Sequence, residues 1–538
     1  MTRPTKVQGN ADSSIFWSAR PSTRNPDVIE QEHLRLDAEI AVIDARIAEL
    51  ELDRVALKRR KNILAPISQL SHDVLGNIFH EIQSLEFDTD NDEEDGAARP
   101  QSPQLPWIRA VTHVCSRWRE LALATPTLWT NIQLGRISLV SEMLRRSNSA
   151  PLSITIPEKG TNIPFPHETK QVLREHLHRT KFLDLRLPPS WYEFLNTILR
   201  SNITPDTLQS CSFSTGVLGV DLPIDILVHS THSLRFLNLD MCFFRLRSLN
   251  TSISFSCLSQ LQLTGPATRC ADFLDFVSLP LACSVTVDFW DRTWDFSVLH
   301  PFIRGFWESR VVHYISVGTQ VTPGGRIDDQ MVLKDNDPTR GSLTTRISSR
   351  TGPPIDVTGT FIRFLSLIPI HRTTSLSVGT KLDKSFWTFI NDSCRDIMDL
   401  DFSSGDLNTF FETFHVRDQV PILKTQDGLI LDPSVDLAAL ATPFRFPKVT
   451  HITFHDALLL KEKLELLKEC LLVRQLVGKQ IHSLTFKNML GLTAPQADAF
   501  SPYIKEKVSW SYPSYLDTDP EDGLDGTEEK SSDDSEEE

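Results

Sequence analysis

The sequence contains few groupings of residues that could carry out catalysis. It has no phosphate-binding loop of the form Gly-x-x-x-x-Gly-Lys-Ser/Thr or Gly-x-Gly-x-x-Gly, no His-Glu-x-x-His zinc motif and no Gly-x-Ser-x-Gly nucleophile motif. His176 and His178 are two residues apart, a spacing that turns their side chains away from each other on a helix. The remaining candidate is a group of acids and tryptophans, made up of Asp288, Trp290, Asp291, Trp294 and Asp295.

Carboxylates beside aromatic rings could bind a carbohydrate or act as a general acid and base. Acids near aromatic residues are also common in the loops that follow strands, and no other part of the sequence indicates a reaction. We therefore expect a protein that is not an enzyme, has no catalytic or metal-binding residues and uses no cofactor.

The eight cysteines predict reduced thiols. None belongs to a Cys-x-x-Cys pair or is followed by a histidine at metal-site spacing, which favours an intracellular compartment. The even spacing of Cys257, Cys270 and Cys283 is best explained by buried, small apolar side chains. The polar N-terminus lacks a secretory signal, and no stretch reaches the ~18 apolar residues of a membrane helix. We expect a cytoplasmic or nuclear protein without a membrane partner.

The formal charge of −15 is concentrated in two segments. Residues 86–95 carry seven acids and no base, and residues 517–538 carry twelve acids and one lysine, which gives −7 and −11. Taking these −18 units from −15 leaves +3 on the rest of the chain. The acidic total argues against a role in holding nucleic acid, because phosphate binding needs a net or local basic surface. Since the acids lie in two segments, however, the total reports their location more than the choice of partner. The rest of the chain keeps both signs of charge, and we expect a protein partner and no nucleic acid.

An apolar seam runs through residues 29–57. Its members follow one another in alternating steps of four and three residues: His33, Leu36, Ile40, Ile43, Ile47, Leu50, Arg54 and Leu57. These steps predict a coiled-coil helix over residues 28–64, which would give a homodimer through residues 29–57. The alternative is a single amphipathic helix folded back on its own chain. The basic run from Arg54 to Lys61 complements the helix C-terminus or serves as a nuclear-import patch.

Short helices are predicted after Pro66, which ends the preceding helix. Ser71 is suited to cap the first of them, and the second begins near Pro106, before a turn at Thr125–Pro126. Each has an apolar face at the 3.6-residue period: Val74, Leu75, Ile78, Phe79 and Ile82 in the first, and Ile108, Val111, Val114, Cys115, Trp118 and Ala122 in the second. So small a unit cannot bury this surface alone, which implies a partner or a docked neighbouring domain.

The segments PISQLSHDVLGNIF and VCSRWRELALATPTLWTNIQL resemble the F-box. The resemblance is to the form found in large sets of fungal proteins, in which a short coiled coil precedes the box and a leucine-rich-repeat-like region follows it. In that family the F-box docks onto the Skp-type adaptor, and through it a cullin, of Skp, cullin and F-box type E3 ubiquitin ligases. The resemblance implies that certain residues supply the apolar contact with the adaptor or the packing beneath it: Pro66, Leu70, Val74, Leu75, Ile78, Phe79, Val114, Cys115, Trp118, Leu128 and Trp129.

Two features depart from the family pattern. Leu70 is followed by Ser71 where the family usually has proline, and the acidic insertion 86–106 separates the first two helices. Serine caps a helix as well as proline starts one, and a solvated acidic loop adds little closure entropy. The alternative is an ordinary helical hairpin within a core.

A pattern of the form apolar-x-x-apolar-x-apolar recurs along the rest of the chain. Its middle position falls at Leu183, Cys211, Leu237, Leu261, Val285, Ile315, Leu376, Leu400, Ile452 and Leu484. Most steps are 24–32 residues, and the two longer ones, of 61 and 52 residues, are near twice the ordinary unit. Helical segments are expected between the strands, at 271–279, 385–394 and 457–476.

This period predicts an irregular leucine-rich-repeat-like α/β solenoid, with a generic α/β domain as the alternative. Residues 320–360 fit the period poorly and are expected to form a loop or an inserted hairpin. Val508 and Trp510 would cover the exposed last strand, in a segment that resembles the end of the same fungal proteins. Serines among the acids of the tail could accept phosphate, although a solubilising tail is favoured.

The predicted organisation is therefore α/β, with five parts. They are a disordered segment 1–27, a coiled-coil helix 28–64, a small all-α F-box-like domain 65–134 with the acidic insertion, a solenoid 135–512 and a disordered acidic tail 513–538. The chain is expected to be a substrate-recognition subunit whose solenoid binds a protein target through residues that the sequence does not identify. A coiled-coil scaffolding protein without ligase association is the alternative.

Overall fold

The computed structural model describes most of the chain. The described residues are 26–89, 106–134, 137–156, 171, 174–187, 207–215, 220–222, 225–244, 252–289, 296–308, 310–321, 327–335, 337, 339–347, 356–403, 408–414, 422–425, 428–431, 445–456, 459, 461–489 and 492–511. Contacts between residues divide the chain into two units, Met1–Leu128 and Trp129–Glu538. The acidic tail, most of the acidic insertion and residues 1–25 lie outside the described residues.

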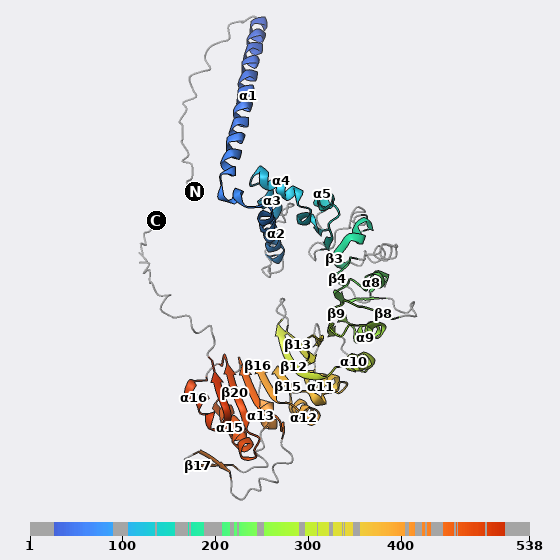
Figure 1. The fold of residues 1–538 in the computed structure, drawn as a ribbon, viewed down its shortest axis with the longest axis vertical. Coiled ribbons are helices and arrows are strands. Elements are labelled where there is room, and N and C mark those ends of the chain that lie inside the picture. Colours follow the sequence, from blue (N-terminus) through green and yellow to red (C-terminus); the bar gives the residue numbers. More distant parts are fainter. Residues whose placement is uncertain are drawn as a thin grey trace, which may run out of the picture. The chain divides into compact units, whose positions relative to one another are not determined.

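The first unit begins with a long helix, α1 (Pro26–Ile63), drawn in dark blue in Figure 1. The helix predicted over 28–64 is thus confirmed, and it starts within the segment 1–27 that was expected to be disordered. Pro26 suits the start of a helix because its missing N–H would have no helical partner there. Every described side chain from Asp27 to Leu64 is exposed, so α1 does not fold back onto another described segment.

Short helices follow α1. They are η1 (Pro66–Gln69), α2 (His72–Thr89), α3 (Pro106–Thr112), α4 (Ser116–Ala124) and η2 (Pro126–Trp129). α2 continues through Thr89, so the first residues of the predicted insertion are helical. The 3.6-residue period over 108–122 predicted one helix, but the structure has two, because Cys115 takes an extended backbone (φ −157°, ψ 169°) between α3 and α4.

A large, mostly parallel sheet forms the centre of the second unit. In spatial order its described strands are β1 (Asn131–Gln133), β2 (Leu152–Ile156), β3 (Thr180–Leu187), β4 (Ser210–Thr215), β6 (Phe236–Asp240), β9 (Gln260–Gly265), β11 (Ser284–Phe289), β14 (Leu343–Ile347), β13 (Ile327–Asp335), β12 (Val312–Val321), β15 (Ser375–Gly379), β16 (Asp399–Ser403), β19 (His451–His455), β20 (Ile481–Lys487) and β21 (Ile504–Trp510). The chain is therefore a mixed α/β protein with a long N-terminal helix.

Among the described residues, three pairs of short strands lie outside this sheet. They are β5 (Val220–Leu222) with β7 (Cys242–Phe244), β8 (Ile253–Ser254) with β10 (Val277–Ser278), and β17 (Ile422–Thr425) with β18 (Gly428–Leu431). Helices connect the strands, and Figure 1 shows α9 to α12 along one side of them. The helices and 3-10 turns that the structure describes in this unit are α5 (Ile137–Ser147), η3 (Leu177–Arg179), α8 (Asp225–His229), α9 (Ala267–Phe276), η6 (Phe296–Leu299), α10 (His300–Trp307), α11 (Val357–Leu365), η7 (Ile370–Arg372), α12 (Lys384–Ser393), α13 (Asn408–Phe414), α15 (Lys461–Leu476), α16 (Ala494–Asp498) and η8 (Ser501–Tyr503).

The predicted strand positions are confirmed. All ten middle positions of the repeated pattern are buried and lie in strands. Successive positions pair directly, as Leu183 does with Cys211 and Leu400 with Ile452, except Val285 and Ile315, whose strands are separated by β14 and β13. The positions two residues later also meet across the strands: the rings of Phe402, Phe454 and Phe486 stack with centroids 5.3 and 5.6 Å apart. Each strand places alternate residues on the buried face, so one apolar layer runs across the sheet. The predicted helices at 271–279, 385–394 and 457–476 correspond to α9, α12 and α15.

The two long steps have different structural causes. Within the 61-residue step, β13 pairs antiparallel with both β12 and β14, so the expected inserted hairpin at 320–360 is present and joins the large sheet. Across the 52-residue step β16 pairs directly with β19, and the large sheet gains no described strand between them. That step therefore does not contain a second strand of the ordinary unit.

Two further sequence predictions differ from the structure. Cys270 and Cys283 are buried, and burial raises the pKa of the Cys283 thiol to about 12, but Cys257 is exposed. Cys257 lies in a bend before β9, where no neighbouring element covers its side chain. Val508 and Trp510 do not cover the last strand; they belong to it, because β21 pairs parallel with β20, with Val508 opposite Leu484.

Candidate protein-binding surface

The start of α4 is held against η1 within the first unit. The guanidinium of Arg117 donates hydrogen bonds to the backbone carbonyls of Ser68 and Leu70, the latter at 2.8 Å. Ser71 caps α2 as predicted, since its hydroxyl accepts the N–H of Val74 at 3.3 Å. These contacts bring η1, the first turn of α2 and the start of α4 to one junction.

Aromatic and aliphatic packing lies beneath this junction. The ring centroids of Phe79 and Trp118 are 5.1 Å apart, and Leu75, Phe79 and Leu128 are fully buried. The side chain of Gln83 donates to the carbonyl of Leu128 at 3.0 Å, which ties η2 to α2. The core therefore fixes the relative positions of α2 and α4.

Apolar side chains remain exposed around the same junction. Ile67 lies on η1, Val74 in the first turn of α2 and Val114 directly before Cys115, the N-cap of α4. Their exposed fractions are 43%, 44% and 53%, and Leu123 on α4 is 38% exposed. Single exposed apolar residues are ordinary, but several of them around one junction mark a surface suited to a protein partner.

The residues predicted for adaptor contact divide by burial. Leu75, Phe79, Trp118 and Leu128 belong to the core of the first unit, whereas Pro66, Val74 and Val114 are exposed and Leu70, Ile78 and Cys115 are half-buried. Trp129 falls in the second unit, where it is 3% exposed and the guanidinium of Arg146 lies 4.4 Å from its ring centre.

Two residues of this surface were not identified from the sequence. Ile67 is an exposed apolar side chain, and Arg117 makes the hydrogen bonds that hold the junction. Ile67 stands inside the segment PISQL and could have been found from that motif. Nothing local indicates the role of Arg117, because its acceptors lie 47 and 49 residues earlier in the chain.

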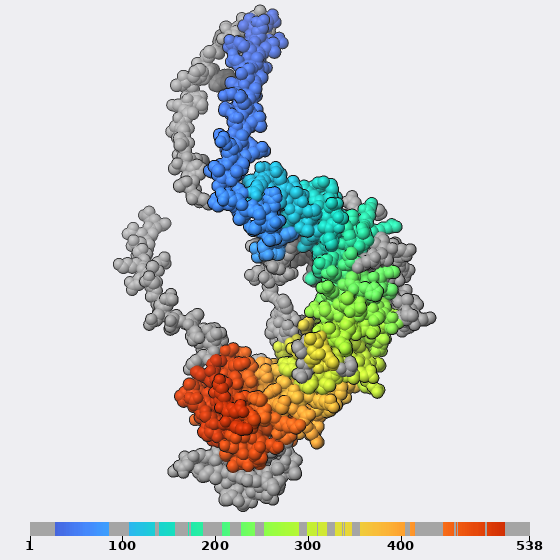
Figure 2. Space-filling model, in the orientation of Figure 1, coloured from blue at the N-terminus to red at the C-terminus, as the bar shows by residue number. Residues whose placement is uncertain are grey.

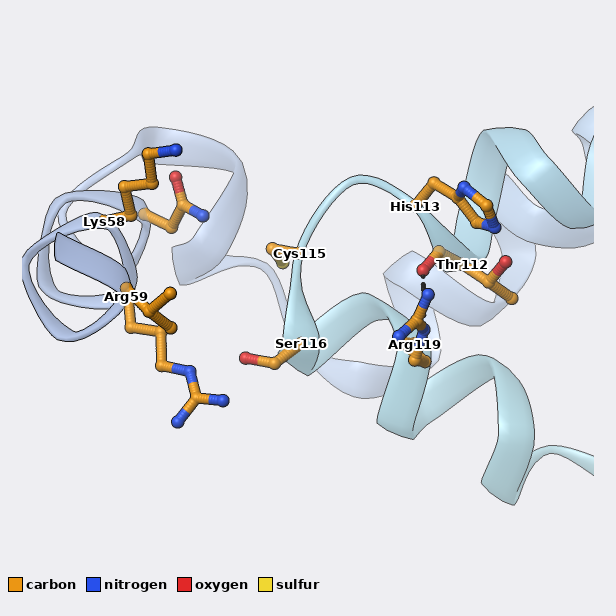
Figure 3. Close-up of a pocket in the computed structure, with 9 residues that line it drawn as sticks. Lys58, Arg59, Thr112, His113, Cys115, Ser116 and Arg119 are labelled. Atoms are coloured by element: carbon orange, nitrogen blue, oxygen red, sulfur yellow. Dashed lines mark hydrogen bonds between the residues drawn. The ribbon is translucent and has the colours of Figure 1, made fainter. Parts of the chain in front are cut away.

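An open pocket of about 280 Å³ lies between the last turns of α1 and the α3–α4 connection (Figure 3). Its lining carries the basic side chains of Lys58, Arg59 and Arg119 together with His113, and it contains no carboxylate. Arg119 donates one hydrogen bond, from its Nε, to the backbone carbonyl of Thr112 at 3.0 Å. The pocket is positively charged and does not pair a general acid with a base.

The acidic group near the tryptophans is described only in part. Asp288 lies on β11, and one of its carboxylate oxygens is 3.7 Å from the guanidinium of Arg346 on β14. The other four members of the group lie outside the described residues. Among the residues that the structure does describe, no three His, Cys, Asp or Glu side chains are grouped so as to hold a metal ion.

No protein-family model matches this chain, and no curated protein is similar to it. No helix in the described part of the chain is both long and apolar enough to cross a membrane. The assignment of function therefore depends on the residues and their geometry.

Proposed function

We propose that this chain is an F-box substrate-recognition subunit of a Skp, cullin and F-box type ubiquitin ligase. Its first unit would bind the Skp-type adaptor, and through it a cullin, in the cytoplasm or nucleus. The single observation that carries the proposal is the set of exposed apolar side chains, Ile67, Val74 and Val114, around a junction fixed by Arg117. This arrangement offers a preformed apolar contact, which binds with little ordering cost.

The second unit would present the target protein. In the proposal its large parallel sheet is an irregular leucine-rich-repeat-like solenoid, in which each strand adds polar side chains to one continuous face. Such a face includes Asp399, Asp401, His451 and His455, with His455 Nε2 3.2 Å from the Asp401 carboxylate. The chain itself would supply proximity and orientation, while transfer of ubiquitin would be catalysed by other subunits.

Binding of the full-length chain to a purified Skp-type adaptor tests this proposal. Exchanging Val74 and Val114 for glutamate places charges in the proposed contact, and we expect affinity to fall at least about tenfold. The matched control exchanges Val228 and Leu281, which are 41% and 52% exposed on the second unit, for glutamate. The control should bind like the unmodified chain, and circular dichroism should show that all variants are folded.

Two results would reject the proposal. One is that the unmodified chain fails to bind any of several Skp-type adaptors at micromolar concentration. The other is that the Val74 and Val114 variant binds as tightly as the control. A chain that binds no adaptor but still self-associates would fit the scaffolding alternative, which the exposed seam of α1 favours.

A further inference from the structure

The apolar seam of α1 is exposed along its whole length. Six of its members have exposed fractions between 43% and 64%: Leu36, Ile40, Ile43, Ile47, Leu50 and Leu57. α1 has 38 residues and is therefore about 57 Å long. Figure 2 shows it as a dark blue rod. Most of the stability of a helix in a protein comes from packing of its apolar face. No described residue of this chain packs on the apolar face of α1.

The face of α1 that lies near the rest of the first unit is different from the face that carries the seam. Val55, Lys58, Arg59 and Asn62 line the pocket that faces the α3–α4 connection. In the heptad that places Ile40 and Ile47 at position a, these residues occupy positions b, e and f. The contact within the unit therefore leaves positions a and d free for another helix.

We propose that α1 pairs with α1 of a second copy of this chain as a parallel, two-stranded coiled coil. β-branched isoleucine at position a with leucine at position d favours two parallel strands. Ile40 and Ile47 occupy a, and three of the four d positions hold leucine, Leu36, Leu50 and Leu57, while the fourth holds Ile43. This inference does not depend on the ligase proposal, because it concerns a different face of the molecule.

Charges beside the seam select the parallel arrangement. In it, position g of one helix faces position e of the next heptad on the other, so Arg46 meets Glu51 of the second copy and Asp53 meets Lys58. An antiparallel pair with Ile47 opposite Ile43 would instead bring Arg46 near Arg46 and Asp44 near Asp44 of the second copy. Like charges would then meet at the centre of the seam.

The polar members of the seam also find opposite charges. A side chain at position a packs beside position g of the other helix, which places Arg54 next to Asp53 of the second copy and His33 next to Glu32. Two pairs near the N-terminus, Glu32 with Asp37 and Glu39 with Asp44, carry like charges. Arg35 offsets them, since its guanidinium lies 3.0 Å from Glu32 and 3.7 Å from Glu39 on its own helix.

The oligomeric state of the full-length chain tests the proposal. Light scattering should give a mass of twice 60.9 kDa for the unmodified chain at ten micromolar. Exchanging Ile40 and Ile47 for lysine should give a monomer. The matched control exchanges Val42 and Leu52 for lysine on the same helix, and it should remain a dimer, because these side chains are 70% and 72% exposed outside the seam.

Disulfide formation tests the orientation. In a parallel dimer the cysteine introduced by Leu36→Cys lies beside the same cysteine of the second copy, so mild oxidation should give a covalent dimer. Leu52→Cys lies outside the seam and should give no covalent dimer. The unmodified chain provides the background, because Cys257 is exposed. Arg46→Glu should weaken association about tenfold, and adding Glu51→Arg should restore it.

The mass measurement tests the dimer, and the disulfide experiment tests its orientation. A monomeric unmodified chain, or a seam variant that still dimerises, overturns the pairing. A dimer that does not cross-link through Leu36→Cys overturns the parallel orientation.

Discussion

Arg474 is a charged side chain inside the core of the second unit. It is 2% exposed, and its guanidinium donates to the backbone carbonyls of Phe446 at 2.9 Å and Val449 at 3.2 Å. Burial lowers the pKa of Arg474 to about 10, so the side chain is charged at neutral pH. Its hydrogen bonds hold the segment that leads into β19 against α15.

We expect Arg474→Met to lower the free energy of unfolding by about 2–4 kcal/mol, because the buried carbonyls lose their donors. Urea denaturation followed by circular dichroism measures the change. Arg363→Met is the control: Arg363 is exposed on α11, and its loss should change stability by less than about 0.5 kcal/mol. Equal stabilities of the two variants would show that the buried hydrogen bonds contribute nothing.

The last strand, β21, closes the described edge of the large sheet. This strand pairs with β20. Its residues Val508 and Trp510 are half-buried, and Ile504 is 8% exposed. Without β21 the backbone groups of β20 and part of its apolar layer would meet water.

Deletion of residues 504–538 should therefore lower the midpoint of thermal unfolding by at least about 5 °C and promote aggregation. Deletion of 512–538 alone keeps β21 and should leave the midpoint within about 2 °C. Scanning calorimetry with light scattering compares the two chains. If both deletions behave alike, β21 is not what protects the edge.

At the scale of the whole molecule, the two proposals concern separate faces of the first unit. α1 leads through Leu64 and Ala65 directly into η1. In a parallel coiled coil the C-terminal ends of both helices meet, so two copies of η1 would lie at the same end. A dimer would then offer two adaptor-binding surfaces.

If both proposals hold, the assembled complex should contain two chains and two adaptors. Mass photometry of the purified complex distinguishes this composition from one chain with one adaptor. The variant with lysine at Ile40 and Ile47 should give the one-to-one complex with unchanged affinity per site. A complex of two chains with a single adaptor, formed in an excess of adaptor, would contradict independent binding surfaces.

Local periodicity in the residue types predicts the helices and strands that do not depend on distant contacts. Steps of four and three residues identified α1, and the recurring apolar positions from Leu183 to Leu484 identified ten strands of the large sheet. All neighbours along the chain among these ten strands pair with each other except β11 and β12. Both predictions follow from the fixed geometry of helix and strand, which sets the side-chain period without reference to distant residues.

Which of these side chains are buried depends on packing between segments that are distant in the chain. Val74 and Leu75 are neighbours on one predicted apolar face, yet one is 44% exposed and the other fully buried. The same holds for three other features: the hydrogen bonds of Arg117, the break between α3 and α4 at Cys115, and the position of β13 between β12 and β14. Each depends on contacts between segments far apart in the chain, and a local pattern of residue types does not specify those contacts.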